Sequence, residues 1–276
     1  GIDSVAKQNE HHLIRWLIAG TGVLLLLLNP PRGEAFTAYA APLLIYFCLT
    51  ALSVAFKVAL IHGDLSLAHG IGTVALLSLP ADAQSDALWA VGLGALVGEL
   101  TRLSWSAVRE FGASALRSIN TTTLARSGLG FGRGVIALYA ASAAYQALGG
   151  ELPLLTLDTA AVPLLTVLAG VYIGVKALLF AVDTRLLDGA PRFTWASGLE
   201  LIAALVLPMP FAVLAGVAYN LFSQTAFALL IAALMMVIVF VYGISQSRLR
   251  LRRRIEEIEA LAVLSETLRS NIELKP

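Results

Sequence analysis

Long apolar stretches alternate with short polar segments along most of the chain. Several stretches reach about 20 residues, the length that a helix needs to cross a hydrocarbon core about 30 Å thick, and they lack the alternation of barrel strands. Residues that interrupt helices divide the apolar stretches into eight candidate spans at residues 13–28, 37–61, 65–80, 87–101, 134–148, 158–181, 196–219 and 225–246. Because three of these are short, the pattern predicts an all-α, polytopic transmembrane helix bundle of six to eight spans, with eight preferred.

The segment 103–132 is the longest part of the predicted bundle, residues 1–246, that contains no candidate span. Its apolar residues, including Trp105 and Phe111, alternate with Arg109 and Arg117 in a roughly helical rhythm. This is typical of a helix that lies on the inner leaflet with its arginines near anionic lipid.

Composition supports membrane insertion. The 276 residues are 58% hydrophobic and 13% charged, with a mean hydropathy of +0.81, whereas soluble domains are about 25% charged. The net charge of +1 gives no reason to expect nucleic acid as a partner. We therefore expect membrane lipids as the surroundings of this chain.

Orientation follows from the basic residues, because short loops rich in Lys and Arg stay in the cytoplasm. With eight spans and an inner N-terminus, nearly all of them fall on one face: Lys7, Arg15, Arg102, Arg109, Arg117, Arg126, Arg133, Arg185, Arg192 and the 248–254 cluster. Arg32 alone falls on the outer face. We expect a multi-pass protein of the inner cell membrane with both termini in the cytoplasm.

No motif in the sequence indicates catalysis. The stretch "GLGFGRG" at 128–134 follows no predicted strand and lacks the spacing of a phosphate-binding loop. His62, Asp64 and His69 do not form a compact ligand pattern for a metal. We expect no enzyme activity, no cofactor and no metal site within these residues.

Ionisable residues inside predicted spans are more informative, because buried charge in a membrane is costly and is usually paired or functional. Glu99 and Arg102 are three residues apart and can pair along one helix face. Lys176 and Glu200 lie near the inner ends of adjacent spans and can pair between helices. These four residues and Asn120 are candidates for a polar network, or for a ligand site if they line a cavity.

The last segment, residues 247–276, begins with a basic collar and continues as an amphipathic helix. The collar, which we expect to contact lipid, consists of Arg248, Arg250, Arg252, Arg253 and Arg254. Apolar residues then recur at helical spacing, among them Ile255, Ile258, Leu261 and Leu268. Such a stripe favours a parallel homodimer, although Arg254 and Ser265 fall near seam positions, and a solvated stalk is the alternative.

The order of features resembles the multi-span sensor domains that precede HD-GYP, GGDEF and histidine kinase or GAF output modules in bacteria. The similarity lies in "DLSLAHGIGTVALLSLP", "GLGALVGELTR", "LRSINTTTLARSGL", "IALYAASAAYQALGG" and "LRRRIEEIEALAVLSETLRSNIELKP". It implies a membrane input domain that passes a membrane or small-ligand cue to a cytoplasmic effector through a C-terminal signalling helix. The layout is also similar to the substrate-capturing membrane components of vitamin transporters. A small-solute binding or transport subunit is therefore the alternative. A structural subunit of a larger membrane complex is a further alternative.

Overall fold

A computed structural model describes the chain over residues 2–60, 63–65, 67–111, 121–188 and 208–222, and at the single residues 206, 227, 229, 231, 233, 236, 255 and 258. The elements of these ranges are α1 (Ile2–Leu28), α2 (Gly33–Ala38), α3 (Ala40–Ala55), β1 (Val58–Leu60), β2 (Gly63–Leu65), α4 (Ala68–Ser78), the 3₁₀ turn η1 (Ala81–Ala83), α5 (Gln84–Phe111), α6 (Thr121–Ala147), α7 (Ala161–Asp188) and α9 (Pro208–Leu221). The described residues are thus almost entirely helical.

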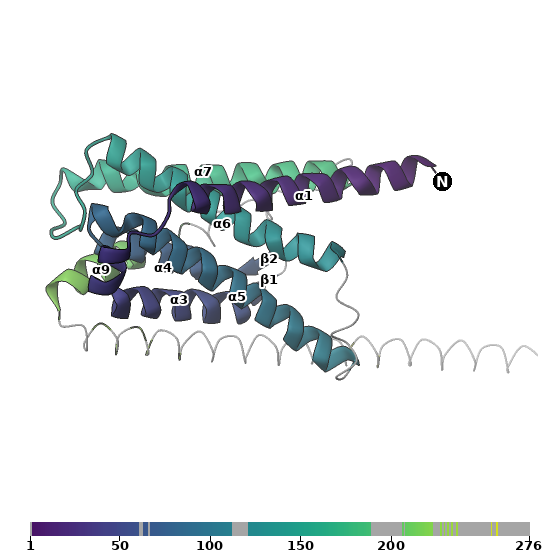
Figure 1. Ribbon diagram of the computed structural model, residues 1–276, viewed down its shortest axis with the longest axis horizontal. Coiled ribbons are helices and arrows are strands. Elements are labelled where there is room, and N and C mark those ends of the chain that lie inside the picture. The colour runs from purple at the N-terminus through teal and green to yellow at the C-terminus, as the bar shows by residue number, and fades with distance from the viewer. Residues whose placement is uncertain are drawn as a thin grey trace, which may run out of the picture.

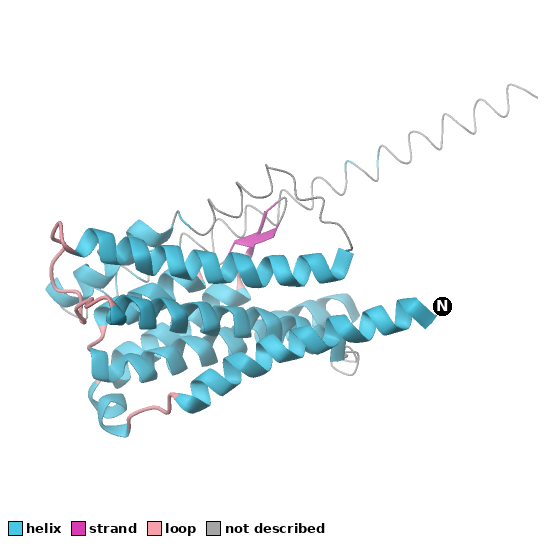
Figure 2. Ribbon diagram, turned by 90° about the horizontal axis from the view of Figure 1, so that it is seen from above, coloured by secondary structure: helices cyan, strands magenta, loops and turns pink. Residues whose placement is uncertain are grey.

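The long helices run side by side along a common direction (Figures 1 and 2). The most extensive contacts join α3 to α5, α1 to α6, α6 to α7 and α4 to α9. Their shared core contains large residues that are fully buried, such as Tyr46, Leu76 and Tyr145. Helices α5 and α6 therefore lie in the middle of the bundle, where each contacts helices from both earlier and later parts of the chain.

Glycines set the closest helix contacts. A Cβ on Gly94 or Gly98 of α5 would lie 2.5 Å from the carbonyl oxygens of Phe47 and Ala51 on α3. The two glycines, four residues apart on α5, therefore let its backbone approach that of α3 within the bundle. The similar pair on α7, Gly170 and Gly174, has no atom of another described element near either Cβ position.

The candidate span 37–61 is interrupted. The chain forms the short helix α2, then α3, and after Phe56 leaves the helical conformation and enters a two-stranded antiparallel hairpin in which Val58 pairs with Leu65 and Leu60 with Gly63. The sequence does not predict a strand here, because the mainly apolar run from Ala40 continues through Leu60 without a glycine and with Pro42 only at its start.

Helices α5 and α6 extend beyond their predicted spans into the segment 103–132. Helix α5 continues through Phe111, and α6 already begins at Thr121, so much of the segment 103–132 belongs to the ends of these two helices. Residues 112–120 lie outside the described ranges. The polar residues that suggested a separate surface helix are, where described, on extensions of long helices.

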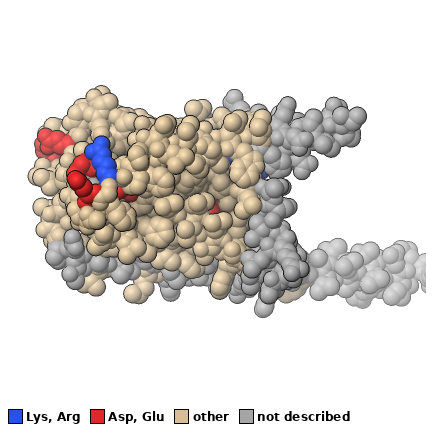
Figure 3. Space-filling view, viewed as in Figure 1, with Lys and Arg blue, Asp and Glu red and all other residues tan. Residues whose placement is uncertain are grey.

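The outer surface of the bundle is strongly apolar. Leu17, Leu24, Leu44 and Leu178 on three different helices are each more than half exposed. On the face shown in Figure 3, charged side chains gather at one end and the middle is nearly free of them. Among the described residues one helix, at Ala161–Asp183, is long and apolar enough to cross a membrane, and Leu13–Leu28, Ala40–Ala55, Ala68–Ser78 and Met209–Leu221 are shorter apolar helices.

Candidate functional site

A buried carboxylate, Glu99, organises the first of two ionic clusters toward the cytoplasmic end of the predicted topology. Its side chain pairs with the ammonium of Lys57, just after α3, and accepts hydrogen bonds from Arg102 Nε and Nη2 at 3.1 and 2.9 Å. The pair of Glu99 and Arg102 along one helix face is therefore present. Lys57 completes the cluster, and its pairing with Glu99 could not be predicted from the sequence.

Asp183 joins three helices in the second cluster. Its Oδ1 accepts a hydrogen bond from Arg15 Nε on α1 at 3.2 Å, and its Oδ2 lies 2.7 Å from Arg133 Nη2 on α6. The guanidinium of Arg133 also lies over the ring of Phe180, 5.6 Å from its centroid. Because all three charged side chains are largely buried, the cluster fixes the relative positions of α1, α6 and α7.

Lys176 lies near cations of both clusters. Its ammonium is 5.5 Å from the ring centroid of Tyr172 and is close enough to Lys57 and Arg133 to be repelled by both. Its predicted partner, Glu200, lies outside the described residues, as does Asn120. The described side chains of this end thus combine five cations with two carboxylates, held mainly by ion pairs.

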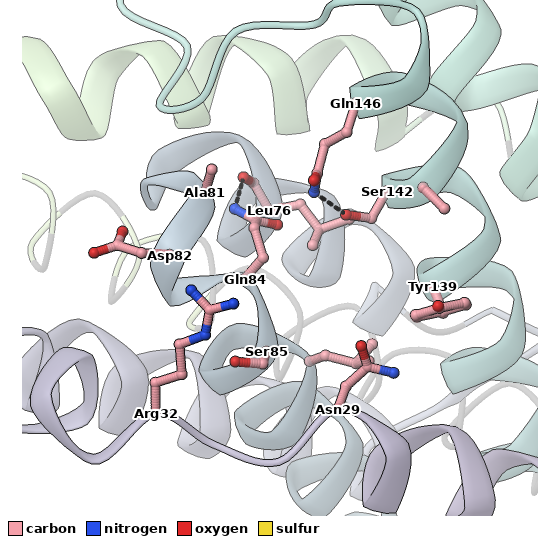
Figure 4. Close-up of a pocket in the computed structure, with 12 residues that line it drawn as sticks. Asn29, Arg32, Leu76, Ala81, Asp82, Gln84, Ser85, Tyr139, Ser142 and Gln146 are labelled. Atoms are coloured by element: carbon pink, nitrogen blue, oxygen red, sulfur yellow. Dashed lines mark hydrogen bonds between the residues drawn. The ribbon is translucent and has the colours of Figure 1, made fainter.

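A polar pocket of about 230 Å³ lies at the opposite end of the bundle (Figure 4). Three parts of the chain surround it: the turn after α1, the turn from α4 into α5, and the last two turns of α6. The polar lining residues are Asn29, Arg32, Asp82, Gln84, Ser85, Tyr139, Ser142 and Gln146. In the predicted topology this end faces outward.

Hydrogen bonds of two side chains fix the walls of the pocket. Gln84 donates its amide hydrogens to the carbonyl oxygens of Leu76 and Leu79, at 2.8 and 2.9 Å, where α4 ends. Trp89 donates to the carbonyl oxygens of Leu26 and Asn29, at 3.1 and 2.8 Å, where α1 ends. Both side chains satisfy carbonyls that a helix end leaves without a partner, so they hold the turns in place.

Asp86, in the first turn of α5, is buried and follows the lining residue Ser85 in the chain. Its Oδ2 accepts a long hydrogen bond, 3.4 Å, from the backbone N–H of Arg32, while its Oδ1 has no hydrogen-bond partner in the described structure. Burial raises the pKa of this carboxyl above its ordinary value, and the nearby Arg32 opposes the rise.

This pocket could not be predicted from the sequence. Its lining residues are ordinary polar residues in three separate turns, and only the fold brings them together. One feature of the sequence did point to the region: Arg32 is the one basic residue that the predicted topology places outside.

The C-terminal candidates lie mostly outside the described residues. This holds for Leu261, Leu268 and the whole basic collar. Ile255 and Ile258 are described as helical, with 47% and 65% of their surface exposed.

Two further features concern the described part of the chain, its possible metal ligands and the one buried histidine among the described residues. It holds no group of three His, Cys, Asp or Glu side chains placed to bind a metal ion. Buried His69 stacks on Tyr172, with 6.1 Å between the ring centroids.

No protein-family profile matches the chain, and no curated protein and no solved structure matches it significantly.

Proposed function

We propose that this chain is a non-enzymatic membrane input and anchoring domain, which relays a membrane or small-ligand cue to a cytoplasmic effector through residues 247–276. The observation that carries the proposal is the distribution of polarity in the bundle. Apolar side chains cover its sides, ionic clusters hold one end together, and a polar pocket opens at the other. Apolar helix surfaces of this kind are stable in a lipid bilayer, because the hydrocarbon core spares them the cost of hydration.

The relay would use helices that join the two ends. Helix α5 begins at the pocket with Gln84 and carries Glu99 of the first cluster, and α6 carries Arg133 of the second cluster and reaches the pocket with Gln146. A shift at the pocket would therefore move the charged groups of both clusters. A relay of this kind requires that the exit helices of a homodimer have two arrangements of similar energy, between which the shift selects.

Cysteine accessibility tests the topology. In full-length protein with Cys48→Ser, we expect Thr156→Cys to react with a membrane-impermeant maleimide in intact cells, and Gln8→Cys to react only after permeabilisation. Labelling of both positions in intact cells would contradict the proposed orientation. Disulfide cross-linking of Ile258→Cys then tests the homodimer, with Glu257→Cys as the off-stripe control.

A small-solute binding or transport subunit is the second candidate, and the pocket is the observation that favours it. The two functions differ in the event that ligand binding triggers. Uptake of a labelled solute into proteoliposomes would favour transport, whereas a ligand-dependent change in Ile258→Cys cross-linking without uptake would favour the relay.

A further inference from the structure

Arg32 occupies an unusual place for a cation. The predicted topology puts every other basic residue on the inner face, and a positive charge on the outer face does nothing to orient the bundle. The structure places Arg32 at the pocket, exposed at its rim, with the side chain directed toward Gln84 in Figure 4. Its position therefore calls for a local reason.

The guanidinium of Arg32 is left without an ion pair in the described structure. The backbone of this residue is engaged: its N–H donates to Asp86, and its carbonyl oxygen accepts from the N–H of Phe36 at 2.9 Å. Asp82 also lines the pocket, but in Figure 4 its carboxylate points away from the side where Tyr139 and Asn29 lie. A guanidinium offers up to five donors in a planar arrangement that matches a carboxylate.

Acceptors without partners lie on the inner wall. Gln84 is 9% exposed, and because its nitrogen must donate to the carbonyls of Leu76 and Leu79, its Oε1 is the atom without a hydrogen-bond partner in the described structure. The buried Oγ of neighbouring Ser85 likewise has none among the described residues. A buried acceptor without a donor is costly, so these atoms favour a bound group that donates hydrogen bonds.

Size limits the ligand. A liquid water molecule takes about 30 Å³ and a dry cavity of about 150 Å³ holds benzene, so the pocket admits a molecule of roughly six to ten heavy atoms. The remaining polar walls, Tyr139, Ser142 and Gln146, disfavour a purely apolar guest. We infer that the pocket binds a small organic carboxylate with a hydrogen-bond donor on the adjacent carbon, as in an amino acid or a hydroxy acid. The carboxylate accepts from Arg32, and the ammonium or hydroxyl donates to Gln84 Oε1 and Ser85 Oγ.

Three probes with the same carbon skeleton test this inference: L-alanine, L-lactate and propionate. Titration calorimetry on the full-length protein in nanodiscs should show saturable binding of alanine or lactate, and propionate should bind at least about tenfold more weakly because it lacks the donor. Whichever of the first two binds more tightly identifies the donor as ammonium or hydroxyl.

Variants then assign the contacts. Arg32→Gln should weaken binding of the better probe by about tenfold or more, and Ser85→Ala by a smaller factor. Glu34→Gln, which removes a nearby exposed charge outside the pocket lining, is the matched control and should bind normally. Comparable melting temperatures would show that each variant is folded.

Three results would overturn the inference: no binding of alanine or lactate up to about 10 mM, equally tight binding of propionate, or unchanged affinity in folded Arg32→Gln. Binding in nanodiscs does not involve the exit helix. A failure here would leave the relay proposal standing, and a failed cross-linking test would leave this inference standing.

Discussion

Glu99 on α5 faces Gly130 on α6, and a Cβ at Gly130 would lie 3.0 Å from Glu99 Oε1. The missing side chain leaves room for a carboxylate that also holds Lys57 and Arg102. The glycine on α6 and the carboxylate on α5 thus depend on each other, because the small residue makes space for the charged one.

Gly130→Val should therefore destabilise the protein by about 1–3 kcal/mol, since the added carbons push the Glu99 carboxylate away from its partners. Thermal unfolding in detergent measures the loss. Gly134→Val, on the same helix with open space around the Cβ position, is the matched control and should change stability far less. Equal losses in both variants would show that helix propensity, and not the contact with Glu99, decides the result.

Asp183→Asn should cost about 3–5 kcal/mol, because it leaves Arg15 and Arg133 buried without their shared counter-charge. Glu151→Gln, in an exposed loop, should have little effect. The loss should shrink in the background of Arg133→Leu, where one stranded cation is absent, and a double-mutant cycle on melting measures that coupling. Additive losses would contradict a direct interaction.

Leu261→Glu combined with Leu268→Glu should separate the exit helices. This prediction depends on the sequence pattern alone, because both residues lie outside the described ranges. Charges on the apolar stripe would repel across a parallel seam. Unchanged oligomeric mass in detergent and unchanged cross-linking of Ile258→Cys would count against a dimer formed by this helix.

The helical character of the chain and several ion-pair residues could be predicted from sequence, for a common physical reason. Apolar runs report helices through their length, and rare charges such as Glu99 and Arg102 stand out within them. Asp183 and Arg133 could be recognised as acidic and basic positions near span ends, but their pairing depends on which helices become neighbours. Nothing in the spacing of residues 15, 133 and 183 specifies that.

The pocket could not be predicted from the sequence, for a related reason. Gln84, Ser85 and Ser142 are common residues at helix ends, where they usually cap a helix or face water. What makes them notable is that Gln84 uses its nitrogen on the end of α4 and leaves its oxygen buried. That geometry depends on the turn between α4 and α5 and on the packing of α6 against it.

Asp86 gives the last prediction, one of pH dependence. It lies just outside the candidate span 87–101, and burial raises the pKa of its carboxyl in the folded protein. Between the unfolded pKa, about 3.9, and the higher folded pKa, the folded state binds more protons than the unfolded state, so stability falls as pH rises through this window. Asp86→Asn removes the charge while keeping an acceptor for the Arg32 N–H. We expect the variant to melt above the wild type at pH 7 and the difference to shrink toward pH 4. Glu151→Gln should show no such trend, and a variant that is less stable than wild type at every pH would mean that the carboxylate's bond to Arg32 outweighs its cost of burial.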